Sequence, residues 1–129
     1  MIRCGLVLLL ACGGAQHASE PPKVDTAALA AELDAEAAEL ATILHRDRAD
    51  CPALATNLRA LFARMTATFR RARDVQQDPE VAKRLTADLQ RYDAVTRTRT
   101  AAMDADLTPD APCVRDPGVR AVLMTMPTL

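Results

Sequence analysis

The sequence predicts an all-α protein: an antiparallel three-helix bundle with a short C-terminal helix, closed by one disulfide. Three observations predict this fold class. Alanine, the residue with the highest helix propensity, is the most frequent residue of the chain. Aromatic residues are scarce, with two Phe, one Tyr and no Trp in 129 residues. Apolar residues recur every three or four positions through three long segments, and none of these segments alternates as a strand would.

The first predicted helix covers residues 26–48. Its apolar residues share one helical face: Leu29, Leu33, Ala37, Leu40 and Leu44. Asp25 or Thr26 is suited to the N-cap position. Acidic side chains fill the body of the segment, and His45, Arg46 and Arg48 collect at its end. This order of charges is favourable for the helix dipole.

The second predicted helix covers residues 52–75. Pro52 fits the first turn of a helix, and Asp50 or Cys51 can cap it. The apolar stripe consists of Leu54, Leu58, Leu61, Phe62, Met65, Phe69 and Ala72. Residues 25–50 carry seven acidic and two basic side chains, whereas residues 51–77 carry five basic and one acidic. We therefore expect the two helices to attract each other, and an external acidic partner for the arginine-rich face is the alternative.

The third predicted helix covers residues 79–107, with Asp78 as its cap and Pro79 in its first turn. Its apolar stripe consists of Val81, Leu85, Leu89, Tyr92, Val95, Met103 and Leu107. The β-branched residues between positions 96 and 100 are its weakest part. Asp116 and Pro117 begin a short fourth helix. Because short connections make neighbouring helices antiparallel, residues 25–129 should form one up-down-up domain.

A short apolar run, residues 4–11, follows Arg3 and ends at Cys12, Gly13 and Gly14. A basic start, a short apolar core and small residues are the plan of a secretory signal peptide. The run is too short to span a bilayer, which needs about 20 apolar residues. A buried N-terminal strand or helical turn is the alternative, but no nearby segment offers it a partner of matching pattern.

The stretch LLAC, residues 9–12, resembles the lipobox of bacterial lipoproteins. The resemblance implies that residues 1–11 are a signal peptide and that Cys12 is lipidated and becomes the acylated N-terminus. Because no Asp follows Cys12, it also implies a location in the cell envelope at the outer membrane, facing the periplasm. Residues 12–24 are small and polar, contain Pro21 and Pro22, and should form a flexible tether to the folded body.

Cys51 and Cys113 are the strongest pair of reactive side chains in the predicted domain. The cell envelope is oxidising, and two remaining thiols usually pair there. In a hairpin that turns near residue 77, Cys51 lies level with about residue 103, and the turn after residue 107 brings Cys113 back to it. A metal site or a redox pair is the alternative, but neither CxxC nor CxxCH occurs. We therefore expect a structural disulfide.

Two polar residues interrupt the apolar stripes. Glu36 lies within about 50° of the centre of the first stripe, at 100° per residue. Counting levels through both hairpins places Glu36 near Tyr92, with which we expect a hydrogen bond. The same count places Arg99 near the end of the first helix, by Leu44 and His45, where it can bind free carbonyls. The alternatives are a buried acid that marks a site and an interior anion site.

Composition and motifs narrow the function. A formal net charge of −1 creates no strong field for nucleic acid. The sequence contains no glycine-rich phosphate loop, GxSxG, HExxH or Glu-x-x-His, so it predicts a protein that is not an enzyme and has no metal or cofactor. We expect a protein anchored to the membrane through its lipid, which binds another envelope protein or has a structural role. A carrier of a small ligand or cofactor in the bundle interior is the alternative.

Overall fold

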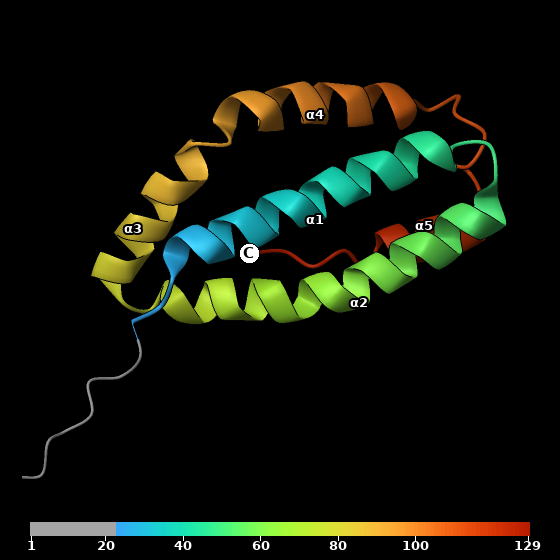
Figure 1. The fold of residues 1–129 in the computed structure, drawn as a ribbon. Helices are drawn as coiled ribbons and strands as arrows, with labels where there is room; N and C mark the ends of the chain where they lie inside the picture. Colours follow the sequence, from blue (N-terminus) through green and yellow to red (C-terminus); the bar gives the residue numbers. More distant parts are fainter. Residues whose placement is uncertain (1–22) are drawn as a thin grey trace, which may run out of the picture.

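The computed structural model describes residues 23–129 (Figure 1), and residues 1–22, with the predicted lipidation site Cys12, lie outside this part. Five helices follow one another: α1 (Thr26–Arg46), α2 (Cys51–Val75), α3 (Pro79–Gln90), α4 (Asp93–Asp106) and α5 (Pro117–Leu123). Residues 23–129 contain no strand, so the predicted all-α class is confirmed. None of these five helices combines the length and the apolar character needed to cross a bilayer.

Four of the five helices begin at an aspartate that caps them. The carboxylates of Asp25, Asp50 and Asp116 each accept a hydrogen bond from a backbone N–H three residues later, at 2.9–3.0 Å. Asp78 accepts from the N–H groups of Glu80 and Val81. Side-chain caps satisfy backbone donors that the first turn of a helix leaves free. The aspartates therefore fix the start of α1, α2, α3 and α5.

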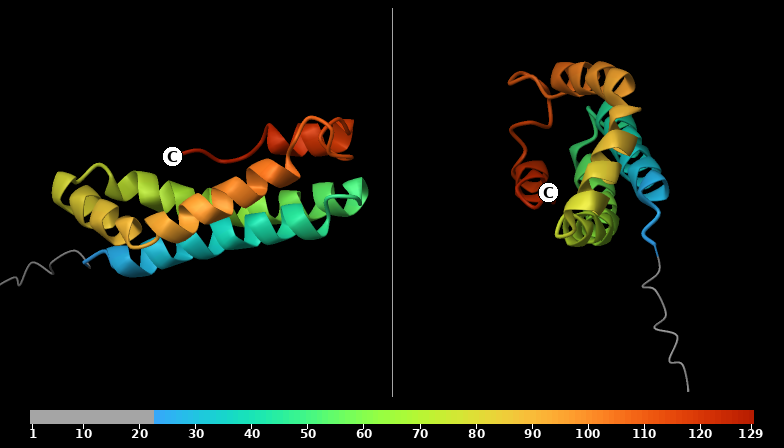
Figure 2. Two further views of the ribbon diagram at one scale, coloured as in Figure 1. Left: turned by 90° about the horizontal axis from the view of Figure 1, so that it is seen from above. Right: turned by 90° about the vertical axis from the view of Figure 1, so that its left-hand side faces the viewer.

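The helices are arranged around α1. α1 contacts α2, α3 and α4, and α5 packs on α2. α2 runs antiparallel to α1, while α4 runs in the same direction as α1 (Figure 1). The right-hand view of Figure 2 looks along the helices, with α4 above, α2 below, and α1 and α5 on opposite sides. The last residues return along α2, where the guanidinium of Arg73 donates to the carbonyl oxygen of Thr128 at 2.9 Å.

The structure differs from the predicted three-helix bundle in its third helix. Residues 79–107 form α3 and α4, which are separated by a turn at Arg91 and Tyr92. The N–H groups of these two residues bond to carbonyls three positions earlier, those of Asp88 and Leu89, at 3.3 and 2.9 Å. Such a tighter turn interrupts the regular α-helical ladder. It lets α3 cross from the end of α2 to α1, after which α4 follows α1 (Figure 1).

Two clusters of buried apolar side chains form the core. The larger one joins α1, α2 and α5, and includes Leu58 and Leu61, both fully buried, and Val119. The smaller one joins the start of α1 and the end of α2 to α3, where Leu85 is 2% exposed. Cys51 and Cys113 form the predicted disulfide, which ties the start of α2 to the segment before α5.

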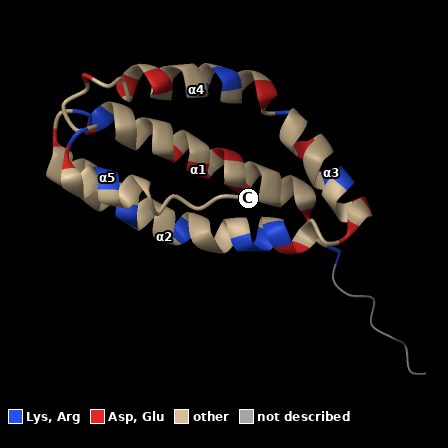
Figure 3. Cartoon of the chain, turned by 180° about the vertical axis from the view of Figure 1, so that it is seen from behind, with Lys and Arg blue, Asp and Glu red and all other residues tan. Residues whose placement is uncertain are grey.

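The predicted attraction between the first two helices takes the form of two ion pairs. Arg64 pairs with Glu39, and Arg71 pairs with Glu32 at 2.5 Å. Figure 3 shows acidic residues along the middle of α1 and basic residues along α2. All four side chains are about half exposed, so each pair contributes only about 0–1 kcal/mol to stability.

Candidate functional site: a pocket between α1 and α2

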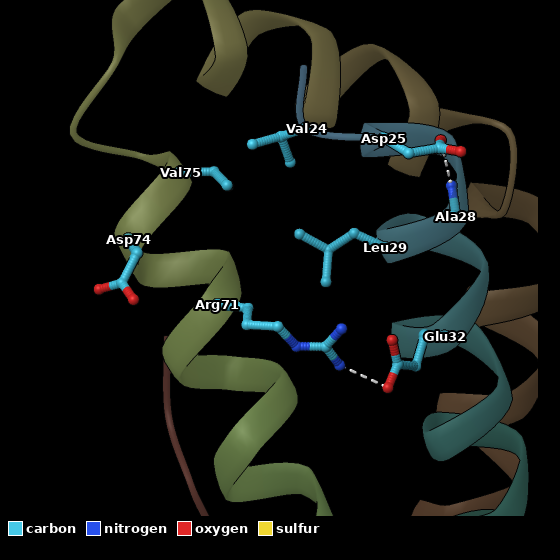
Figure 4. A pocket seen from close by; sticks show the side chains of 8 residues that line it. All are labelled: Val24, Asp25, Ala28, Leu29, Glu32, Arg71, Asp74 and Val75. Carbon is cyan, nitrogen blue, oxygen red and sulfur yellow. Dashed lines mark hydrogen bonds and ion pairs between the residues drawn. The ribbon is translucent and has the colours of Figure 1, made fainter. Parts of the chain in front are cut away.

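A pocket of about 370 Å³ lies between the start of α1 and the end of α2. We call it the α1–α2 pocket, and Figure 4 shows the eight side chains that line it. Its apolar lining consists of Val24, Ala28, Leu29 and Val75. Its charged lining consists of Asp25, Glu32, Arg71 and Asp74. Val24, one of the lining residues, is the last residue of the tether predicted for residues 12–24.

Local sequence accounts for the pocket. Ala28 presents only a methyl group on the surface of α1, and this leaves space that a larger side chain would fill. Leu29 is 5% exposed and belongs to the smaller core cluster, so it fixes the depth of the pocket. Val24 precedes α1 and is 42% exposed. Figure 4 shows Val24, Leu29 and Val75 turned toward a common centre.

The charged lining is only partly neutralised. The guanidinium of Arg71 donates to Glu32 at 2.5 Å, and this hydrogen bond is the main cause that lowers the pKa of the Glu32 carboxyl from its usual value. Asp25 accepts the capping bond from the N–H of Ala28 at 2.9 Å. The carboxylate of Asp74 has no hydrogen bond or ion pair with any of residues 23–129. Three carboxylates and one guanidinium give the lining a formal net charge of −2.

A polar cluster lies next to the pocket along α1 and α2. The hydroxyl of Thr68, a residue only 1% exposed, donates to Glu36 at 2.7 Å and lies 3.2 Å from Glu32. Arg71 in turn donates to the Thr68 oxygen at 3.3 Å. The second carboxylate oxygen of Glu36 is buried and has no partner among residues 23–129. A hydroxyl has one proton, so its shorter contact assigns that proton to Glu36.

The predicted hydrogen bond between Glu36 and Tyr92 is not formed. Glu36 bonds to Thr68 of α2, while Tyr92 lines a separate shallow pocket with residues such as Ala37 and Leu89. The predicted level of Tyr92 along α1 was nearly right, because Tyr92 shares this pocket with Ala37, which directly follows Glu36. The predicted face was wrong, since α1 has neighbours on two sides and Glu36 points to α2 rather than to the α3–α4 junction.

Arg99 also has a different partner from the one predicted. Its guanidinium donates to Asp34 of α1 at 2.8 Å and does not bind the carbonyls at the end of α1. Long side chains in a helix point back toward its N-terminus. Asp106 meets His45 at the end of α1, and α4 runs in the same direction as α1, so Arg99 lies about seven residues before that end. The tilt carries its head group still further toward the first half of α1, and the predicted level beside Leu44 and His45 was therefore wrong. The end of α1 instead meets Asp106, whose carboxylate lies 3.2 Å from the ring of His45.

The other predicted site residues are three cysteines. Cys51 and Cys113 are joined to each other, and Cys12 lies outside the described residues. Within residues 23–129, no group of three or more His, Cys, Asp or Glu side chains is arranged to hold a metal ion.

The α1–α2 pocket was not predicted, although the sequence contains a signal for it. Counting equal numbers of residues outward from the turn at residues 47–50 places Val24 about level with Val75. Val24 and Val75 lie outside the regular apolar stripes of the two helices and close to Ala28. Two apolar residues at the same level predict an apolar surface there. The pocket was missed because only the stripes within the helices were considered.

Searches for a related protein give no further information about this site. Comparison of the chain with models of protein families, with curated proteins and with solved structures finds no match.

Proposed function

We propose that this protein is a lipid-anchored component of the bacterial cell envelope that binds another envelope protein and has no enzymatic activity. The observation that carries the proposal is the α1–α2 pocket, an apolar surface beside the residue at which the tether joins the body. An apolar pocket with a few charged groups around it is the usual form of a binding site. The resemblance of residues 9–12 to a lipobox supports the anchor at Cys12.

The proposed anchor would keep the pocket near the membrane. Twelve positions separate Cys12 from Val24, and a flexible chain of that length has a root-mean-square end-to-end distance of about 20 Å. Confinement to the periplasmic face of the outer membrane raises the effective concentration of partners held at the same surface. A partner anchored in the same membrane therefore suits the pocket better than a freely diffusing one.

A carrier of a small ligand is the second candidate function. A volume of about 370 Å³ falls within the range of small-molecule sites, about 300–1,000 Å³. Native mass spectrometry of protein purified from the envelope separates the two candidates, because a carrier retains its ligand.

The anchor and the partner need separate experiments. Cys12→Ser should block fatty-acid labelling and release the protein from membranes, whereas unchanged labelling and fractionation would contradict the lipoprotein proposal. Wild-type protein, anchored in the membrane and cross-linked before solubilisation, should capture a specific envelope protein. Recovery of a co-purifying small molecule, with no specific protein captured, would favour the carrier instead.

A further inference from the structure

Two carboxylates of the α1–α2 pocket, Asp25 and Asp74, form no ion pair with residues 23–129 and lie on either side of its apolar floor, although Asp25 also caps α1. Figure 4 shows Asp25 at the edge formed by α1 and Asp74 at the edge formed by α2. Glu32 and Arg71 neutralise each other, so the other two carboxylates account for the net charge of −2. Lys23, Arg70 and Arg73 neighbour lining residues in the sequence, but none of them lines the pocket.

This charge pattern selects among possible occupants. Phospholipid head groups and fatty acids carry anionic oxygens, which two carboxylates without a cationic partner repel. A bare cation gains nothing from contact with Val24, Leu29 and Val75, and burial of an apolar group supplies the main favourable energy at such a surface. The complementary group is therefore an aliphatic side chain with a positive charge on each side. Its volume must be small, since about 370 Å³ accommodates only one or two side chains.

We infer that the α1–α2 pocket binds a linear segment of the protein partner in which one or two large aliphatic side chains are flanked by lysine or arginine. The aliphatic group occupies the floor formed by Val24, Leu29 and Val75, and the flanking cations lie near Asp25 and Asp74. The inference rests on the proposed function, because it names the part of the partner that the anchored protein recognises.

Two pairs of variants test the pocket in the full-length protein. Ala28→Trp fills the space over Leu29, and Ala27→Trp places the same side chain on an exposed neighbouring position that does not line the pocket. Asp74→Asn removes one rim charge, and Asp104→Asn removes an exposed carboxylate from α4 as its control. All four positions are exposed, so unchanged circular dichroism should confirm that each variant folds.

The probe is the peptide Gly-Lys-Leu-Leu-Lys-Gly with blocked ends, followed by methyl NMR of the protein. We expect weak, saturable shifts of the Leu29 and Val75 methyl groups, with a Kd of about 1 mM because a short flexible peptide loses much entropy on binding. Ala28→Trp should abolish these shifts and Ala27→Trp should preserve them. Asp74→Asn should weaken binding by about two- to fivefold, as expected for one exposed charge pair, and Asp104→Asn should leave it unchanged.

Control peptides decide whether the stated chemistry is right. Replacing both lysines by glutamate, or both leucines by serine, should remove binding. Equal binding of the glutamate peptide, or no binding of the lysine peptide, would overturn the inference. So would contacts of Val75 with residues 1–22 in the free protein, which would assign the pocket to this chain itself. Concentration-dependent self-association that Ala28→Trp abolishes would assign it to a second copy.

The cross-linking experiment separates this inference from the proposed function. A specific envelope partner that Ala28→Trp fails to capture, while Ala27→Trp captures it, supports both. A partner captured equally by both variants upholds the function and overturns the role of the pocket. Capture of no specific protein by the wild type overturns the proposed function itself.

Discussion

Arg99 of α4 and Asp34 of α1 form an ion pair that is largely shielded from water. The guanidinium donates to the carboxylate at 2.8 Å, and the two side chains are only 11% and 19% exposed. α4 contains no buried residue, and its other close polar contact with α1 is the pair of Asp106 with the exposed His45. The Arg99–Asp34 pair is therefore the best-shielded interaction that holds α4 on α1.

Arg99→Met should destabilise the protein by about 1–3 kcal/mol. The methionine keeps the apolar part of the side chain, but Asp34 loses its hydrogen-bond partner while it remains largely buried. The measurement is the urea midpoint with the disulfide intact. Arg97→Met is the control, since Arg97 is exposed on the same helix and makes no ion pair with residues 23–129. Equal midpoints for Arg99→Met and Arg97→Met would show that the head group of Arg99 is solvated.

Thr68→Val should cost about 1–3 kcal/mol, although the two side chains have nearly the same shape. The substitution removes the hydroxyl that donates to Glu36 and leaves both oxygens of that carboxylate without a partner. Thr68→Ser keeps the donor and should retain more stability. Adding Glu36→Leu to Thr68→Val should recover much of the loss, because the stranded carboxylate is then gone. If the denaturant midpoint of this double variant shows no recovery, the stability lost in Thr68→Val comes from packing instead.

Tyr92→Phe should change the stability by less than about 0.5 kcal/mol. The tyrosine hydroxyl makes no hydrogen bond with residues 23–129, and its ring packs against the smaller core cluster in either variant. Tyr92→Ala removes the ring and should cost more. A large effect of Tyr92→Phe that is absent in a Glu36→Ala background would show that the hydrogen bond predicted from the sequence does form.

Helix starts were predictable because their signals are local. Asp78 with Pro79 and Asp116 with Pro117 bring a cap and a first-turn residue together at adjacent positions, and the structure begins α3 and α5 there. The break at Arg91 and Tyr92 has no such signal, since neither proline nor glycine occurs near it. Long-range packing sets this break: α3 buries Leu85 in the smaller cluster while α4 continues along α1.

Side-chain partners were not predictable: Tyr92 lies near the predicted level of α1 but on another face, and Arg99 meets Asp34, ten residues from the predicted Leu44. Periodicity gives the angle of Glu36 around α1, but α1 has neighbours on two sides, and the sequence does not say which of them faces that angle. The disulfide was predictable because only two cysteines lie in residues 23–129 and the turn after α4 brings them together. The pocket depends on Val24 and Val75, which lie at the margins of α1 and α2, where stripe patterns end.

The Cys51–Cys113 disulfide should contribute up to about 4 kcal/mol, because it closes a loop with a sequence separation of 62 residues. The double variant Cys51→Ser with Cys113→Ser should unfold at correspondingly lower urea concentration. Alkylation of protein taken directly from the envelope, followed by mass spectrometry, should leave both cysteines unmodified until a reductant is added. Two alkylated thiols before reduction would show that the pair is not oxidised in the cell.

Acid should weaken the junction of α1 and α2 through Asp47. Its carboxylate accepts from the Nε and Nη2 atoms of Arg46 at 2.7 and 2.8 Å and from the amide of Asn57 at 2.7 Å. These bonds, that of Arg46 first, lower the pKa of Asp47 from 3.8 to about 2. Because the unfolded chain takes up this proton more readily, the stabilisation is complete above about pH 4 and is lost as the pH falls toward 2.

Asp47→Asn should therefore be less stable than the wild type at neutral pH, and the difference should shrink between about pH 4 and pH 2. Asparagine accepts through one oxygen only and carries no charge to attract Arg46. Urea midpoints of both proteins across pH 2–6 measure this difference, and the carboxyl carbon of Asp47 should titrate near 2 by NMR. Asp104→Asn is the control, because Asp104 is exposed on α4 and makes no ion pair with residues 23–129. If the wild type stays more stable than Asp47→Asn by the same amount down to pH 2, the carboxylate of Asp47 is not preferentially ionised in the folded state.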